Sequence, residues 1–92
     1  MQTQKTPVYL KALTLRDISD ISIVKEDIKK QMILIIRVTP LAQKDLEELR
    51  KVVEDLYSYT QSAGGDIARL GEERIVITPP GVKIWRGLYD LK

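Results

Sequence analysis

The side chains of this chain that could act in acid–base or nucleophilic chemistry are carboxylates, lysines and tyrosines. The 92 residues include no His and no Cys, so a base that titrates near neutral pH and a thiol nucleophile are both missing. The carboxylate pairs Glu47–Glu48 and Glu72–Glu73 fall at an expected helix start and in an expected turn. These positions favour solvated charges over paired acid and base catalysis. We therefore expect a protein that is not an enzyme.

Sites for metals, cofactors and nucleic acids are also disfavoured. Without Cys there is no thiolate site, and the carboxylates do not follow the loop offsets of a six-coordinate oxygen site. Gly64–Gly65–Asp66 and Pro79–Pro80–Gly81 lack a Lys at the P-loop spacing, so they predict turns and no cofactor. Fifteen Lys and Arg are interspersed with thirteen Asp and Glu, which leaves a net charge of +2 and no single-sign surface for nucleic acid.

Length and hydropathy predict one soluble domain in the cytoplasm. A chain of 92 residues is long enough for one hydrophobic core and too short for two. No apolar run approaches the length of a transmembrane helix, and the first six residues are polar, without the core of a signal peptide. The absence of Cys gives no indication of an oxidising compartment.

The first half of the chain predicts strand, helix and strand. Residues 8–15 are rich in strand formers, and apolar residues then recur at helical spacing over 21–28 between charged neighbours. Residues 32–39 form an apolar run that is too short for an ordinary helix and ends at Pro40, so we expect a strand that is buried on both faces.

The second half predicts a long helix and three strands. Asp45 and Glu48 have the spacing of a capping box, in which Asp45 accepts from a free amide and Glu48 reaches back. Gly64–Gly65 is expected to end this helix. The three strands are expected over 66–70, 74–78 and 82–86.

The resulting order, β-α-β-α-β-β-β, predicts an α+β protein, a two-layer α/β sandwich with two helices packed on a sheet of about five strands. Two helices cannot cover both faces of such a sheet, so one face is left open or is covered by a second copy. We therefore expect a homodimer. Its contacts are expected on the outward side of the apolar strand or on the broad face of the second helix, at Ile33, Ile35, Leu49, Val52, Leu56 and Tyr59.

The segment GGDIARLGEERIVITPPGVKIW, residues 64–85, resembles the SepF family of cell-division proteins in its archaeal form, as do Lys11–Ala12–Leu13 and Arg16–Asp17. The likeness extends from about Val8 to Arg86, which makes 8–92 the core domain and 1–7 a disordered or linker segment. The resemblance implies a non-enzymatic adaptor. SepF-like proteins dimerise through an α/β domain, bind the C-terminal tail of FtsZ and tether it to the membrane through an N-terminal amphipathic helix.

The resemblance also bears on location. No amphipathic helix precedes Val8, so the chain is expected to be a truncated core or to have lost membrane attachment. At full length such a protein would lie at the inner face of the cell membrane, at the division site. The alternative interpretation is a small ferredoxin-like domain that binds nucleic acid or a small ligand, which the β-α-β start and the Arg-rich strands permit.

The expected site for the FtsZ tail lies in the segment 67–83. The tails of the family's partners are short peptides with mixed apolar and acidic residues, so a receptor needs apolar walls and a few cations. We expect these from the residues Arg69, Arg74, Ile75, Ile77 and Lys83.

Overall fold

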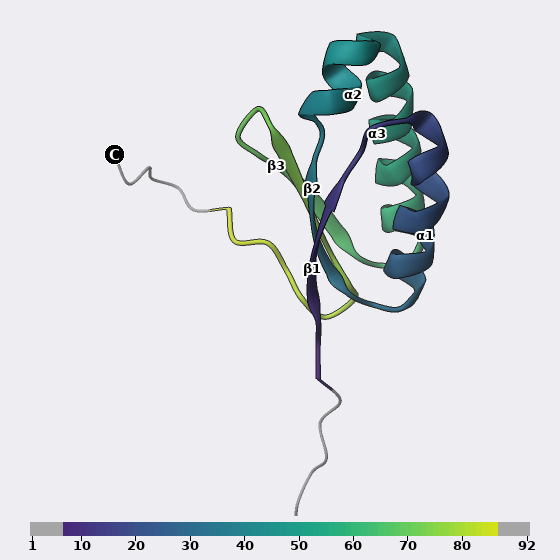
Figure 1. Cartoon of the computed structure of the whole chain (residues 1–92). Helices are drawn as coiled ribbons and strands as arrows, with labels where there is room; N and C mark the ends of the chain where they lie inside the picture. The colour runs from purple at the N-terminus through teal and green to yellow at the C-terminus, as the bar shows by residue number, and fades with distance from the viewer. Residues whose placement is uncertain (1–6, 87–92) are drawn as a thin grey trace, which may run out of the picture.

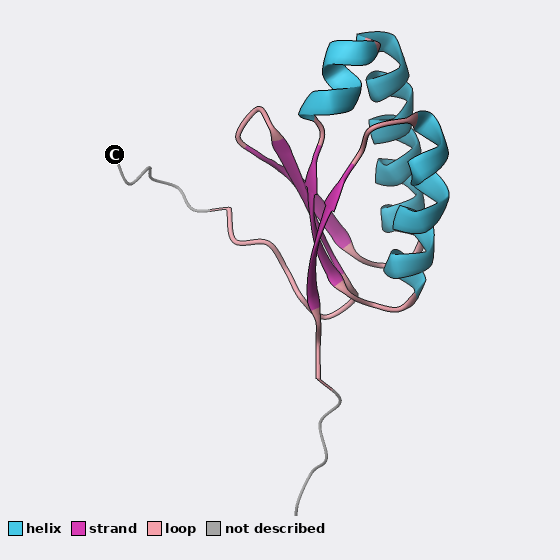
Figure 2. Ribbon diagram, viewed as in Figure 1, coloured by secondary structure: helices cyan, strands magenta, loops and turns pink. Residues whose placement is uncertain are grey.

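In the computed structural model, which describes residues 7–86, the helices lie on one side of a four-stranded mixed sheet (Figures 1 and 2). The strand order is β1-β2-β4-β3, with β1 and β3 at the two edges. The elements in chain order are β1 (Leu10–Thr14), the 3-10 helix η1 (Ile18–Asp20), α1 (Ile21–Lys29), β2 (Ile33–Arg37), α2 (Thr39–Lys44), α3 (Leu46–Ser62), β3 (Asp66–Leu70) and β4 (Arg74–Thr78).

A β-α-β unit forms the first half of the sheet. β1 and β2 are parallel and adjacent, with Ala12 opposite Ile35, and α1 makes the crossover between them. The helix buries Val24 and Ile28 against the sheet and leaves its charged residues in solvent. Asp17 caps η1 in a full capping box with Asp20, so the chain turns into the helical layer directly after β1.

A β-hairpin forms the other half of the sheet. β3 and β4 are antiparallel, and their connection begins at Gly71, whose φ of +72° lies in the left-handed region that suits glycine. β4 then pairs with β2, placing Val76 opposite Ile35. A ferredoxin-like domain has the order β-α-β-β-α-β. The order β-α-β-α-α-β-β seen here differs from it.

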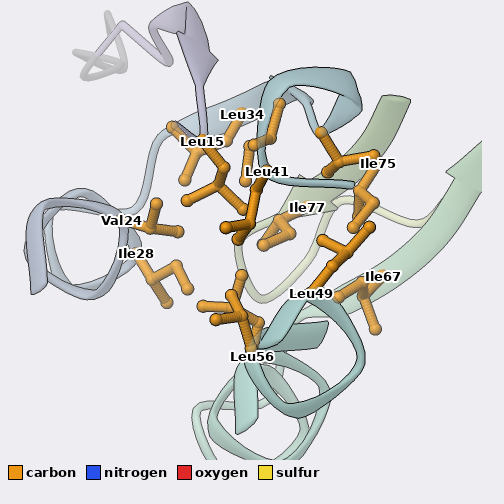
Figure 3. Packing of buried hydrophobic residues seen from close by; sticks show 13 residues of the cluster. Leu15, Val24, Ile28, Leu34, Leu41, Leu49, Leu56, Ile67, Ile75 and Ile77 are labelled. Atoms are coloured by element: carbon orange, nitrogen blue, oxygen red, sulfur yellow. The ribbon is translucent and has the colours of Figure 1, made fainter. Parts of the chain in front are cut away.

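The hydrophobic core lies between the sheet and the helices. Leu34 and Ile36 of β2 are fully buried, and their neighbours on β4, Ile77 and Ile75, are each 1% exposed. Figure 3 shows side chains from the strands and helices meeting in this layer. The 13 buried hydrophobic residues are Leu15, Val24, Ile28, Leu34, Ile36, Val38, Leu41, Leu49, Val52, Leu56, Ile67, Ile75 and Ile77.

The α+β two-layer architecture confirms the predicted fold class, but the prediction of a fifth strand was wrong. Residues 82–86 were expected to be a fifth strand, and they follow β4 as an irregular segment. The amide of Ile84 donates to a side chain, Asp66 Oδ2 at 3.0 Å. The Ile84 amide therefore bonds to a side chain, whereas in a strand it would bond to the backbone of a neighbouring strand.

The start of the second helix also differs from expectation. The apolar strand was expected to run up to Pro40, but β2 ends at Arg37. Pro40 instead lies in the first turn of the extra short helix α2, where a proline at N1 or N2 is well tolerated. Asp45 caps α3 by accepting from the Glu48 amide at 3.1 Å. The Asp45 amide donates to Leu41 O at 2.8 Å, so Glu48 does not reach back as predicted.

Gly64 and Gly65 end α3 as predicted, for two different reasons. Gly64 has φ +84°, which a residue with a side chain adopts only with strain. A Cβ on Gly65 would lie 2.2 Å from Thr78 O and 3.2 Å from Thr60 Cγ2, so the second glycine allows the helix end to meet the end of β4.

The limits of the described residues leave part of the domain prediction outside the structure. The expected linker at 1–7, apart from Pro7, lies outside the described residues, as do residues 87–92 of the expected core domain. Among the described residues, no helix is both long enough and apolar enough to span a membrane.

Candidate functional site

A hollow of about 420 Å³ lies on the helical side of the molecule, where α2 and α3 meet the turn between β3 and β4. Its apolar wall comes from Ala42 of α2 and from Leu46, Leu49 and Val53, which share one side of α3 because they lie three or four residues apart. Leu46 is 56% exposed, so this wall is open to a partner. We refer to it as the α3 hollow.

Charged side chains complete the lining of the α3 hollow. Arg50 and Glu54 come from α3, and Arg69 and Glu72 come from β3 and the turn that follows it. Arg69 Nη2 donates to Glu72 O at 2.9 Å, and this hydrogen bond orients the guanidinium. The bond takes one of the five N–H donors of the guanidinium. The hollow thus combines apolar surface with two guanidinium groups and two carboxylates, an arrangement suited to a peptide with apolar and charged residues.

The face of the sheet opposite the helices is the second candidate surface. Ile33 and Ile35 of β2 and Val76 of β4 are partly exposed there, next to Leu10, which is 64% exposed, and Leu70, which is 51% exposed. We call this surface the open face. These residues come from all four strands, and Ala12 of β1 and Ala68 of β3 add to the same surface.

One end of the open face is positively charged. Arg37 of β2 and Arg74 of β4 lie directly opposite each other in the antiparallel register, and both side chains are exposed. Like charges in such a pair repel. This end of the open face therefore favours acidic groups in anything that covers it.

The residues predicted for tail binding do not form one site. Ile75 and Ile77 were assigned wrongly, because both face the helices and are buried in the core. Arg69 shares the helical side with Ile75, its partner in the register, whereas Arg74 lies on the open face. Lys83 follows the far end of β4, away from the β3–β4 turn. Only Arg69 lines the α3 hollow.

The residues predicted for the dimer contact also separate into two groups. Leu49, Val52 and Leu56 pack in the core of their own chain, as Figure 3 shows for Leu49 and Leu56, so they are withdrawn from the dimer surface. Tyr59 packs against the core, and the Lys25 ammonium lies 5.2 Å from its ring centre. Ile33 and Ile35 lie on the open face, where a dimer contact stays a prediction.

Sequence reasoning missed the role of Asp66, which holds the segment after β4. Its carboxylate accepts from Arg86 Nη1 at 3.0 Å and Nη2 at 3.1 Å, and from the Ile84 amide at 3.0 Å. The hydrogen bonds from Arg86, and after them that from the Ile84 amide, hold the pKa of Asp66 well below its usual range. The spacing of an acidic residue and an Arg twenty positions apart gave no signal of this contact.

A second low-pKa carboxylate connects η1 to α2. Asp17 accepts a hydrogen bond from Lys44 Nζ, and it also accepts from the Ser19 amide at 3.1 Å. The Lys44 contact is the largest cause that lowers the pKa of Asp17, and the same pair raises the pKa of Lys44. Both side chains are about half exposed, so we interpret the pair as a surface link between helices.

Within residues 7–86, no group of three or more His, Asp or Glu side chains could hold a metal ion. The two carboxylate pairs considered as acid–base candidates also separate. Glu47 lies 3.9 Å from Arg50 on the surface of α3, whereas Glu72 lines the α3 hollow beside Arg69.

The sequence and the fold of the chain are similar to those of known proteins. A family model described as cell division protein SepF matches residues 10–84. A SepF-like protein from Archaeoglobus fulgidus superposes with a TM-score of 0.82 at 25% identity, covering 91% of this chain and 100% of that chain. A SepF-like protein from Pyrococcus furiosus gives 0.78 at 28% identity, with 90% and 100% covered.

A third solved structure is the cell division protein SepF from Methanobrevibacter smithii in complex with FtsZ-CTD. It has a TM-score of 0.75 at 18% identity and covers 86% of this chain and 99% of that chain, so it shows a likeness of fold. No curated protein sequence matches the chain.

Proposed function

The chain belongs to the SepF family of cell-division proteins, and from this premise we propose that it is a non-enzymatic adaptor for FtsZ. In this proposal two copies pair through their open faces, and each copy binds the C-terminal tail of one FtsZ molecule in the α3 hollow. The family match over residues 10–84 includes every residue that lines the hollow and every strand of the open face.

The observation that carries tail binding is the chemistry of the α3 hollow. Its volume of about 420 Å³ lies in the range of sites that take small ligands and peptide side chains. Leu46 and Val53 offer apolar surface, while Arg50 and Arg69 offer guanidinium groups beside the carboxylates of Glu54 and Glu72. A short tail with apolar and acidic residues would place the apolar side chains on α3 and its carboxylates on the two arginines.

The solved relative from Methanobrevibacter smithii supports the choice of partner, since it was determined in complex with FtsZ-CTD. At 18% identity that likeness extends to the fold alone. The side chains of this chain, and not that likeness, support the α3 hollow as the place of binding.

Pairing through the open face is proposed because that face keeps apolar side chains in solvent. Covering a large aliphatic side chain stabilises by about 1.5 to 3 kcal/mol, so several such residues can offset an association cost of about 4 to 15 kcal/mol. A contact of two identical faces around a two-fold axis gives two tail sites per dimer, one on the helical side of each copy.

Membrane attachment belongs to the proposal only for a chain that carries an amphipathic helix of the kind that the family resemblance implies. Such a helix would bring the dimer to the inner face of the cell membrane at the division site. These 92 residues alone have a net charge of +2, and we expect them not to sediment with anionic liposomes at physiological salt.

Calorimetry with an FtsZ tail peptide tests the placement of the tail site. Arg69→Glu reverses a charge that lines the hollow, and Leu46→Ala removes exposed apolar surface from its wall. Each should weaken binding by about tenfold. Lys29→Glu, on the exposed side of α1, is the matched charge control and should bind the peptide like the parent.

Arg74→Glu separates this site from the open face, because it reverses the same kind of charge on the other side of the sheet. We expect it, and Lys83→Glu, to keep the parent affinity for the peptide. A loss with Arg74→Glu and none with Arg69→Glu would move the tail site to the open face. Tighter binding of an RNA oligonucleotide than of the tail peptide would contradict the adaptor function itself.

A further inference from the structure

Trp85 is the most exposed large hydrophobic residue of the described chain, with 84% of its surface in solvent. It is also the chain's single tryptophan. An exposed tryptophan on a segment that is fixed by hydrogen bonds is unusual for a surface that stays in water, because large aromatic residues are enriched where proteins bind each other. The exposed indole of Trp85 is therefore a candidate contact for another protein surface.

Residues 79–86, which we call the arm, are attached to β3 and β4 at several points. Thr78 Oγ1 donates to Val82 O at 2.6 Å, and the Ile84 amide donates to Asp66 Oδ2. Arg86 donates to both carboxylate oxygens of Asp66, and its Nη2 also donates to Ile67 O at 2.8 Å. A bidentate pair of this kind fixes direction as well as position. Trp85 thus lies between two residues that are anchored to the start of β3.

The arm leaves the sheet on the side of the open face. Asp66 lies opposite Thr78 in the register and alternates with Ile67, which faces the core, so the Asp66 side chain lies on the side away from the helices. Figure 1 shows the segment after β4 running out on that side. The anchored arm and the open face therefore border the same space.

The area of the open face indicates what occupies this space. Four strands about 4.8 Å apart and five residues long at about 3.4 Å per residue give a flat area of roughly 300 Å². A stable protein–protein contact buries about 800 Å² on each partner. Trp85 alone can bury about 150 to 250 Å², so an arm that closes over a partner supplies about a third to a half of the difference.

We propose that the Asp66–Arg86 clamp holds the arm in place so that Trp85 packs on the open face of a second copy of this chain. Around a two-fold axis each copy gives one arm and receives one, so the two tryptophans act together. A second copy is a suitable partner because its open face is an apolar sheet surface that its own helices leave uncovered. The Trp85 indole can pack on such a surface. This inference rests on the proposed dimer and names the residues that complete it.

Fluorescence and sedimentation of the full chain test the arm, because Trp85 is the only source of tryptophan emission. In the parent, emission should shift to longer wavelength on dilution, along the same curve as dimer dissociation by sedimentation. Trp85→Ala should raise the dimer dissociation constant about tenfold or more, since buried tryptophans dominate contact energies. Asp66→Asn should also raise the dimer dissociation constant, and it should shift the tryptophan emission to the longer wavelength of an exposed side chain.

Ile23→Ala is the matched control, because Ile23 is 53% exposed on the helical layer. It should leave the dissociation constant unchanged. A parent that stays monomeric would overturn the proposed dimer and the arm together. A dimer with parental affinity in both Trp85→Ala and Asp66→Asn would overturn the arm and keep the dimer. An emission shift that follows addition of the FtsZ tail peptide, and not dimerisation, would also overturn it.

Discussion

The two faces of β2 carry nearly the same residues in opposite surroundings. Leu34 and Ile36 face the helices and are fully buried, whereas Ile33 and Ile35, one position away, face outward and are only partly covered. Neighbouring strand residues lie on opposite sides of the pleat, so the chain covers one side of its most apolar strand and leaves the other. The apolar surface of this chain therefore exceeds what its own helices can cover.

The largest expected difference between the faces comes from placing one charge on each. Ile36→Asp puts an unpaired carboxylate into the core, which should cost more than about 4 kcal/mol and unfold most of the protein. Ile35→Asp should leave the chain folded and monomeric. Circular dichroism and sedimentation check both, and an unfolded Ile35→Asp variant would show that the open face is part of the folding core.

The next largest effect concerns Lys11 and Asp27, which connect β1 to α1 on the covered side. Lys11 Nζ lies 2.8 Å from Asp27 Oδ2, and the Asp27 side chain is 4% exposed against 43% for Lys11. Lys11→Met should lower the free energy of unfolding by about 3 kcal/mol because it leaves a buried charge alone. Asp27→Asn should cost about 1 kcal/mol, since the lysine can reach water. Denaturant titration checks the order, and equal losses would contradict it.

Acid is expected to lower the stability of the folded protein by a smaller amount. The carboxylates concerned are Asp66, which pairs with Arg86 on the open side, and Asp17, which pairs with Lys44 between the helices. The pKa of Asp66 and that of Asp17 are both lowered in the folded protein. Their contribution to stability is therefore complete above the unfolded pKa of about 4 and is lost as the pH falls below it. Asp66→Asn and Asp17→Asn should each flatten the decline in stability below pH 4. Thermal melts from pH 7 to pH 2 check this, and a decline as steep as the parent's would contradict it.

The smallest expected effect is a gain of stability in the helical layer. Gln31 follows α1 with φ +62°, in the left-handed region where glycine is favoured. Gln31→Gly should raise the free energy of unfolding by about 0.5 kcal/mol, because the strain relieved slightly exceeds the added freedom of the unfolded chain. The dimer dissociation constant should not change. A loss of stability in denaturant titration would show that the Gln31 backbone is not strained.

Much of the fold could be predicted because local signals agreed with the final packing. The spacing of Val24 and Ile28, the cap at Asp45 and the two glycines after α3 each predicted an element that is present. Residues 82–86 have the same local character as a strand, but their backbone is held by Asp66 instead of a neighbouring strand. A contact between a side chain and a distant amide leaves no periodic pattern in the sequence.

The residues of the site were harder to predict because they depend on which side chains of a strand lie on the buried face of the sheet. In Ile75–Val76–Ile77 three apolar residues in a row allow either face to be the buried one, and the pairing with β2 decides it. The broad apolar arc of α3 was assigned to a partner, whereas Leu49, Val52 and Leu56 cover the sheet of their own chain. The α3 hollow joins α2, α3 and the β3–β4 turn, and only the packed fold brings these together.

The strand order β1-β2-β4-β3 also governs how the chain folds. The β-α-β unit and the β3–β4 hairpin each form between neighbours in sequence, but the contact that joins them, β2 with β4, brings together residues from distant parts of the chain. Such a contact forms late, because the intervening chain must first be ordered. Until it does, one side of the apolar β2 strand is an unpaired edge that can template aggregation. We expect mutations at the β2–β4 seam, such as Val76→Ala, to accelerate unfolding more than they slow folding, which stopped-flow kinetics would measure.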